Sequence, residues 1–413
     1  MAQQRSRYIK AFDGLRAIAT LAVLFYHLSP AFMPSGYFGV VIFFVLAGFL
    51  TVRQVLLKED RTRLRLPTPY LARRLSKLLP PLLLMLLVVT LVMLLTPSYR
   101  SFLPRYPAAL LSTLFGVNNQ TQMFLKVSYF ETHGYLRPLK HMWALSLEWQ
   151  FYLFFAFTFH RLYRARDRMK WAKLALGGSL LSYALLLITF KTTEGALVYY
   201  SFFTRLHAFL LGSLGALGFV YVPQRIITTR SWTGLETYYV DDVPRNPLGK
   251  RGSPSEGLAA ILLLLIVIGF FIPFSLDKGI LIGLPVYALM ATMLAVFIHE
   301  DKGRVSLFLR FKPFPWIASR SYEIYLWHYP IITFLMYELG KTRTPLFLRY
   351  VLCFIVSLLA AEVAHRLVYG LRNLQRSYPN SRLARGLHML TLALFIVLFV
   401  ISIALFIKSP EDT

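Results

Sequence analysis

The residues of this sequence that could do chemistry lie inside apolar segments, and the first segment is the most informative. Arg16 and His27 are eleven residues apart, so on a helix their side chains share one face about 16 Å apart along the axis. Asp13 lies three residues before Arg16, close enough for an ion pair that would fix the guanidinium. Such a face suits anion binding at one depth and proton transfer at another. The alternative is that Arg16 and His27 snorkel to the two membrane surfaces.

A second polar set lies in the segment HMWALSLEWQFYLFF. His141 and Glu148 are seven residues apart and therefore nearly share a face, with Ser146 beside them. Glu148 is too short to snorkel from about two turns below the outer surface. An ionisable residue at that depth costs about 2.5–3.5 kcal/mol, so we expect a functional or structural polar role for Glu148.

Two later segments add further candidates. In SRSYEIYLWHYPI, Tyr325 and His328 are three residues apart on one face, whereas Tyr329 also suits an interfacial aromatic. Arg205 and His207 open another apolar segment near the outer surface, where snorkelling explains Arg205 equally well. The first of these two segments also carries Arg320, Ser321 and Glu323.

The composition predicts an all-α transmembrane bundle. Of 413 residues, 56% are hydrophobic and 15% charged, against about 25% charged in soluble domains. A window of about 19 residues gives about eleven spans, and residues 103–124 form a broken apolar stretch that suits a re-entrant or interfacial segment. The predicted spans are 12–31, 36–57, 78–96, 141–160, 172–190, 203–222, 257–273, 280–298, 314–337, 347–369 and 386–407.

The distribution of positive charge predicts the topology. Outside the spans, 29 Lys and Arg fall in alternate segments beginning with the N-terminus, and 10 fall in the intervening ones. Positive charge concentrates on the cytoplasmic side, so we expect the N-terminus inside and the C-terminus outside. The net charge of +26 then faces anionic lipid headgroups rather than nucleic acid. Residues 223–256 are expected to form an irregular cytoplasmic connection.

Several classes of chemistry lack their motifs. Cys353 is the sole cysteine, which excludes an intramolecular disulfide and a cysteine-based metal cluster. The sequence has no HExxH, GxSxG, Walker or strand-linked GxGxxG pattern, so we predict no metal site and no serine-hydrolase or nucleotide-hydrolysis chemistry. The basic N-terminus precedes an apolar segment that holds ionisable residues, which indicates a retained first helix.

Five motifs in order carry a resemblance: FDGLRAIATLAVLFYHL, GYFGVVIFFVLAGFL, HMWALSLEWQFYLFF, FFTRLHAFLLGSLGA and SYEIYLWHYPI. The chain resembles the acyltransferase-3 family of integral membrane acyltransferases, in particular the membrane domain of Gram-positive peptidoglycan O-acetyltransferases. That resemblance implies transfer of an acetyl group from cytoplasmic acetyl-CoA to hydroxyls of an extracytoplasmic glycan, in a multi-pass protein of the bacterial cytoplasmic membrane. The family often has an acidic residue where this chain has His207.

The resemblance and the residue chemistry together give the expected site. The arginine and histidine of the family's first motif match Arg16 and His27, and His27 is expected to act either as general base or as acyl carrier. Arg16, together with basic residues of 58–77 such as Arg73 and Arg74, is expected to contact the phosphates or the pantetheine of CoA. The expected catalytic residues are His27, Glu148, Tyr325 and His328. The expected substrate-binding residues are Asp13, Arg16, Arg73, Arg74, Ser146, Arg205 and Ser321.

For the domain organisation we expect a membrane domain over residues 1–385, and an eleventh span with an extracytoplasmic stub over 386–413. In the resembling proteins a further helix leads to an SGNH-type domain, which we do not expect within this chain, so a separate domain or protein could relay the acetyl group. Alternatives are an O-acetyltransferase for another surface polysaccharide or glycolipid, a secondary transporter with a proton relay, and a non-catalytic scaffold or sensor.

Overall fold

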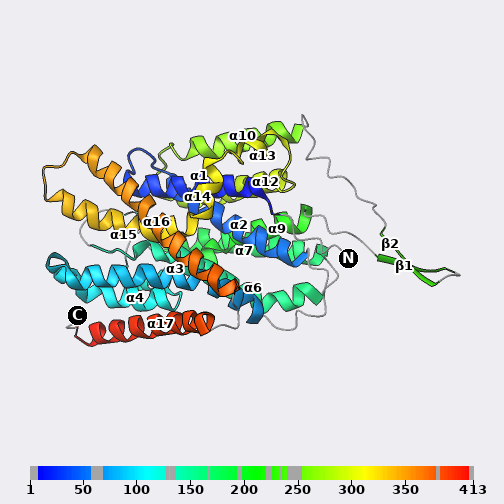
Figure 1. Ribbon diagram of the computed structural model, residues 1–413. Coiled ribbons are helices and arrows are strands. Elements are labelled where there is room, and N and C mark those ends of the chain that lie inside the picture. Colours follow the sequence, from blue (N-terminus) through cyan, green and yellow to red (C-terminus); the bar gives the residue numbers. More distant parts are fainter. Residues whose placement is uncertain are drawn as a thin grey trace.

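The computed structural model describes residues 8–56, 68–126, 130, 136–164, 168–192, 198–219, 226–231, 234–239, 254–377 and 382–408. Figure 1 shows long helices lying side by side in one bundle, with α1 beginning at one end of it and α17 ending at the other. The long helices are α1 (Lys10–Leu28), α2 (Gly39–Leu56), α3 (Thr68–Leu95), α6 (Trp143–Arg164), α7 (Arg168–Thr192), α9 (Phe202–Phe219), α10 (Pro254–Gly269), α12 (Leu284–Ile298), α15 (Ser321–Gly340), α16 (Leu346–Ser377) and α17 (Arg382–Lys408). The short helical elements are η1 (Gly36–Phe38), η2 (Pro97–Arg105), α4 (Tyr106–Leu114), α5 (Asn118–Phe124), η3 (Lys140–Met142), α11 (Leu276–Lys278), η5 (Gly279–Gly283), α13 (Gly303–Phe308) and α14 (Pro313–Ser319).

Among the described residues, eight helices are long and apolar enough to cross a membrane. They are the predicted spans carried by α1, α2, α3, α7, α9, α12, α16 and α17. The other three predicted spans are also helical, but α10 is shorter, and α6 and α15 contain the polar residues of the second and third candidate sets. The multi-pass membrane protein is therefore supported, while the count of eleven and the sidedness stay predictions.

The broken apolar stretch forms no single long helix. It is divided between the end of η2, the nine residues of α4 and the seven of α5. Gly116 turns the chain between α4 and α5 with φ at +68°, a backbone conformation that glycine adopts without strain. At 1.5 Å per residue neither helix approaches the roughly 30 Å of a hydrocarbon core. Instead α4 packs against α17.

The connection after α9 contains a short hairpin, which corrects the prediction of an irregular loop, while the bundle itself is all-α as predicted. Strands β1 (Ile226–Ser231) and β2 (Gly234–Tyr239) pair in antiparallel register, with Ile226 opposite Tyr239. The sequence of β1 is rich in the β-branched residues that favour strands. Figure 1 shows this hairpin lying apart from the helices.

Helix α1 lies in the interior of the bundle. Of its apolar window 72% is buried, compared with 11% for α17 at the periphery. The first turn of α1 is held by Asp301, whose carboxylate accepts the backbone N–H of Ala11 at 2.9 Å and the Nε–H of Arg310 at 2.9 Å. An acidic group at a helix N-terminus satisfies orphan donors and complements the helix dipole.

Glycines allow α2 and α9 to approach closely. A Cβ atom at Gly48 of α2 would overlap the carbonyl oxygen of Phe209, and one at Gly212 of α9 would overlap the carbonyl oxygen of Val45. Small residues are typical of such interfaces, because lipid gives no hydrophobic drive for helix association and packing must supply it. The contact of α2 with α9 therefore depends on these two glycines.

We predict that Gly212→Leu destabilises the bundle and that Gly218→Leu does not. A side chain at Gly212 must push α9 away from α2, an overpacking that costs about 1–3 kcal/mol or more. A Cβ at Gly218, on the same helix, meets no atom within 4 Å. Thermal unfolding of the two variants in one detergent, followed by tryptophan fluorescence, measures the difference. Equal unfolding midpoints would contradict the proposed role of Gly212.

Candidate active site

A cavity of about 140 Å³ lies in the bundle interior. Its walls come from α1, α2, α3, α6 and α15. Apolar side chains such as Val40 and Phe43 form one part of the lining, and ionisable side chains form the other. The predicted site residues that line it are Arg16, Arg74, Glu148, Ser321 and Tyr325.

On α1 the cavity follows the face predicted from the sequence. Arg16 and Val23, seven residues apart, both line it. His27 lies one turn beyond Val23 on the same face but is not among the lining residues. The arginine therefore belongs to the cavity, and the histidine lies past its end.

Asp13 does not pair with Arg16, so the predicted ion pair is wrong. Both carboxylate oxygens of Asp13 accept the hydroxyl of Tyr8 at 2.7 Å. Among the described residues, no ion pair within 4.0 Å joins Arg16 to this carboxylate. The Nε of Arg16 has no hydrogen-bond partner among them either. The guanidinium of Arg16 thus lines the cavity without a carboxylate partner.

Glu148 and Arg74 are connected through one tyrosine. The hydroxyl of Tyr152 donates to Glu148 Oε1 in a short hydrogen bond, and Arg74 Nη1 donates to the same hydroxyl at 3.4 Å. The Arg74 guanidinium also lies 4.6 Å from the centre of the Tyr152 ring, within the range of a cation–π contact. These contacts hold the Arg74 guanidinium of α3 and the Glu148 carboxylate of α6 together at one wall of the cavity. Tyr152 was not among the predicted residues, although its position four residues after Glu148 places both side chains on one face of α6.

Three histidines gather beyond the cavity. The His328 ring centre lies 5.3 Å from that of His27 and 5.4 Å from that of His141, and the ring of Tyr329 lies 4.8 Å from His27 and 5.0 Å from His141. We call these four residues the histidine cluster. They come from α1, η3 and α15. Among the described residues no group of three or more His, Cys, Asp or Glu side chains is placed to hold a metal ion.

The hydrogen bonds of His328 define its neutral tautomer. Its Nδ1 lies 2.8 Å from the carbonyl oxygen of Tyr325 and 3.0 Å from that of Ile324. Carbonyl oxygens only accept, so Nδ1 carries the hydrogen and the neutral ring keeps a lone pair on Nε2. Within the described part of the chain, Nε2 has no hydrogen-bond partner. The cluster therefore contains a buried nitrogen that can accept a proton.

Tyr325 connects the cavity with the histidine cluster. It lines the cavity, its ring centre is 5.2 Å from that of His141, and its hydroxyl donates to the backbone carbonyl of His141 at 2.5 Å. A group held in the cavity can thus approach the cluster past a single side chain. The pairing of Tyr325 with His328 follows the predicted spacing, whereas the meeting of His141 with both residues was not predicted.

Arg205 lies behind the cavity wall rather than in it. The side chain is 1% exposed, and its guanidinium lies 4.7 Å from the ring centre of Tyr199, 5.7 Å from that of Phe44 and 5.9 Å from that of Trp143. Phe44 also lines the cavity. Aromatic faces attract a cation, and the contact gains strength when both groups are desolvated. Full burial excludes snorkelling as the account of Arg205.

The remaining predicted residues occupy different surroundings. Ser146 faces α5, where its hydroxyl accepts the backbone N–H of Asn118 at 3.0 Å and donates to the carbonyl of Met142 at 3.2 Å. Ser321 is buried at the cavity wall, and Arg73 is exposed on α3. The geometry therefore gives Ser146 a structural partner and places Ser321 at the site.

We predict that Ser146→Ala lowers the free energy of unfolding by about 1–3 kcal/mol, because it leaves the buried N–H of Asn118 without an acceptor. Ser321→Ala, the matched change at the cavity wall, removes no hydrogen bond of the described structure and is expected to unfold like the wild type. Thermal unfolding in detergent compares the two variants. Destabilisation by Ser321→Ala alone would contradict this assignment.

Known proteins share this sequence pattern. Residues 9–366 match the family described as acyltransferase domain. The chain is 31% identical over 367 residues to the peptidoglycan O-acetyltransferase OatA of Listeria monocytogenes. The aligned residues make up 88% of this chain and 55% of that protein. It is 29% identical over 373 residues to the O-acetyltransferase OatA of Staphylococcus aureus, covering 88% of this chain and 57% of that protein. The chain thus spans little more than half the length of these relatives. No solved structure matches it. With a match over most of its length, this multi-pass membrane chain belongs to the acyltransferase domain family.

Proposed function

We propose that this chain is a membrane O-acetyltransferase that takes an acetyl group from cytoplasmic acetyl-CoA and passes it to hydroxyls of an extracytoplasmic cell-wall glycan, with peptidoglycan as the acceptor. The single observation that carries the proposal is the arrangement of polar residues along one face of α1. On α1, an arginine without a carboxylate partner lines a cavity, and a histidine one turn past the cavity joins a cluster of imidazoles.

Arg16 supports an anionic donor. Arg16 is partly buried, its Nε has no hydrogen-bond partner and it has no ion pair with a described carboxylate, so an anionic ligand would compensate its charge. The phosphates of acetyl-CoA supply such a charge, and a guanidinium binds phosphate in a planar, bidentate geometry. Arg74 lines the same cavity, and the exposed Arg73 beside it extends the positive charge outward.

The acetyl group then has to meet a nucleophile and a base. In the simplest step, a histidine nitrogen of the cluster takes the proton of an acceptor hydroxyl, whose oxygen attacks the thioester carbon. The carbon–sulfur bond breaks, and the CoA thiolate leaves and takes up a proton. His27 is our candidate for this base, with His328 and Tyr325 beside it and Glu148 on the cavity wall. In the alternative, a His27 nitrogen attacks the thioester carbon, the carbon–sulfur bond breaks and CoA leaves, and the acceptor hydroxyl then takes the acetyl group from the imidazole, which regains a proton.

The sidedness of the reaction is also part of the proposal. The excess of Lys and Arg supports a cytoplasmic position for the N-terminal end of α1, and with it for Arg16. The relatives are longer than this chain, and we propose that an SGNH-type domain or partner outside the 413 residues relays the acetyl group to the glycan.

We expect Arg16→Ala to weaken CoA binding by about 10- to 100-fold, the loss typical of hydrogen bonds to charged groups. Arg16→Lys keeps the charge but not the planar fork, so most of the loss remains. Arg366→Ala, which removes an exposed cation paired with Glu362, is the control. Isothermal titration of purified protein with CoA measures all three. Unchanged affinity in Arg16→Ala would exclude the proposed contact.

We expect His27→Ala to lower acetyl transfer by about 10²–10⁴-fold or more, because it removes general-base help or the acyl carrier itself. CoA binding and thermal stability should stay close to wild type. His388→Ala, on peripheral α17, is the matched control. Release of free CoA from acetyl-CoA, followed with a thiol reagent, gives the rate.

Three results separate the alternatives. An acetyl group found on the His27 peptide after incubation with acetyl-CoA alone identifies the carrier mechanism, and its absence in an active enzyme identifies the base. Wild-type turnover by a folded His27→Ala protein would refute both roles. A transporter or scaffold releases no free CoA at all.

A further inference from the structure

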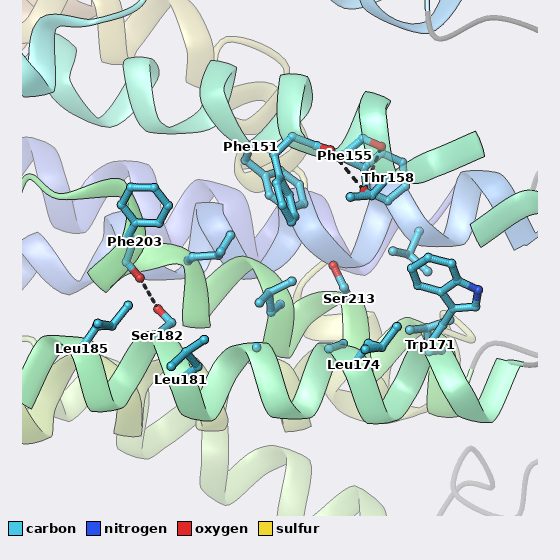
Figure 2. A pocket seen from close by; sticks show the side chains of 17 residues that line it. Phe151, Phe155, Thr158, Trp171, Leu174, Leu181, Ser182, Leu185, Phe203 and Ser213 are labelled. Carbon is cyan, nitrogen blue, oxygen red and sulfur yellow. Dashed lines mark hydrogen bonds between the residues drawn. The ribbon is translucent and has the colours of Figure 1, made fainter. Parts of the chain in front are cut away.

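A second hollow of about 230 Å³ lies between α6, α7 and α9, away from the site described above. Figure 2 shows α7 along one side of it and α6 along the other. Leu174 and Leu181 of α7 line it and are 53% and 63% exposed, so the hollow opens to the outside of the bundle, where lipid surrounds the protein. We call it the α6–α7 groove.

The three hydroxyl groups of the groove already have hydrogen-bond partners, whereas the indole Nε1 of Trp171 has none among the described residues. Thr158 donates its hydroxyl to the carbonyl of Phe154 at 3.1 Å, Ser182 to that of Phe203 at 2.6 Å, and Ser213 to that of Phe209 at 2.9 Å. Two of these bonds are drawn as dashed lines in Figure 2. The groove therefore offers apolar contact and little hydrogen bonding, which suits a hydrocarbon ligand.

The groove is long enough for a lipid tail. Trp171 lies at one end and Leu185 near the other, as Figure 2 shows, and both belong to α7. Fourteen residues of helix span about 21 Å. That length exceeds the roughly 15 Å of one leaflet's hydrocarbon layer, half of the typical core.

Positive charge marks the Trp171 end. Arg168 donates to the backbone carbonyls of Leu217 and Ala216 near the end of α9, and the Leu217 side chain lines the groove. Lys170 and Lys173 are exposed on the same end of α7, whose first turn contains no acidic residue. A basic cluster beside an apolar channel is complementary to an anionic lipid headgroup.

We propose that the α6–α7 groove binds one tail of an anionic glycerophospholipid, with the phosphate of its headgroup at Arg168, Lys170 and Lys173. The proposal does not depend on the acetyltransferase activity. It commits to a phospholipid of the leaflet that meets the start of α7, because three cations lie at that end of the helix, compared with Lys191 alone in its last turn.

Adjacent glycines in α7 offer a matched pair of variants. Gly178 lines the groove, and a Cβ there would meet Leu210 Cδ1, the flexible end of a side chain, at 2.8 Å. Gly177 faces open space, with no atom within 4 Å of its Cβ position. A leucine at either position raises helix propensity equally, but only Gly178→Leu fills the groove.

The test uses the full chain in detergent with added dioleoyl phosphatidylglycerol, and native mass spectrometry counts the bound lipid. We expect one lipid on the wild type and on Gly177→Leu, and binding at least about tenfold weaker for Gly178→Leu. Phosphatidylcholine with the same tails should bind about tenfold more weakly than phosphatidylglycerol. The double variant Lys170→Gln, Lys173→Gln should lose this preference, whereas Lys191→Gln at the other end of α7 should keep it.

Equal lipid retention by Gly177→Leu and Gly178→Leu would overturn the proposal, as would equal binding of the two phospholipids. If Gly178→Leu does not fold, the wild type still decides the question. Phosphatidylglycerol with brominated tails should then quench Trp171 fluorescence, measured as the difference from Trp171→Phe, more strongly than brominated phosphatidylcholine does. Equal quenching by the two lipids contradicts a site selective for an anionic headgroup.

Discussion

The burial of α1 is the constraint on which the rest of the structure depends. A helix that carries Arg16 and His27 cannot face lipid without a large cost, so other helices must enclose it. Glycines make that enclosure tight: a Cβ at Gly36 or Gly39 would overlap the backbone of α1 itself. The same principle brings α2 against α9 at Gly48 and Gly212. Small residues thus allow the backbones to approach closely, and this close packing creates an interior in which ionisable side chains are tolerated.

Within that interior, charged groups lie beside one part of α1 and imidazoles lie beside another. Arg16 faces the cavity together with Arg74 and the Tyr152–Glu148 pair, whereas His27 belongs to a cluster in which imidazoles face one another rather than carboxylates. Cations at one end suit a charged donor, and neutral imidazoles at the other suit proton transfer. Tyr325 stands between the two sets, so the path of a transferred group leads past its ring.

Helical periodicity predicted which residues of one helix share a face. The common face of Arg16 and His27 and the pairing of Tyr325 with His328 follow from 3.6 residues per turn. Relations between distant segments were beyond that reasoning: His141 meets His328 across 187 positions because η3 and α15 pack together, and no local pattern encodes this. Asp13 was assigned to its nearest cation, yet a tyrosine outside the helix satisfies it. The β1–β2 hairpin was missed because the prolines and glycines of residues 223–256 indicated an irregular connection, and the short run of β-branched residues in β1 was given less weight.

Helix α9 separates the candidate site from the lipid-facing groove. Leu206, Leu210 and Leu217 line the groove, while Phe209 and Gly212 contact α2 on the other side. Phe209 stacks on both Phe44 and Phe151, at 4.4 Å each, and Phe44 is also part of the cavity wall. Because the glycine contacts leave α9 no room to move toward α2, a tail in the groove supports α9 from its open side. The lipid would then fix the position of α9, whose Arg205 lies against Phe44 of the cavity wall, without touching a reacting group.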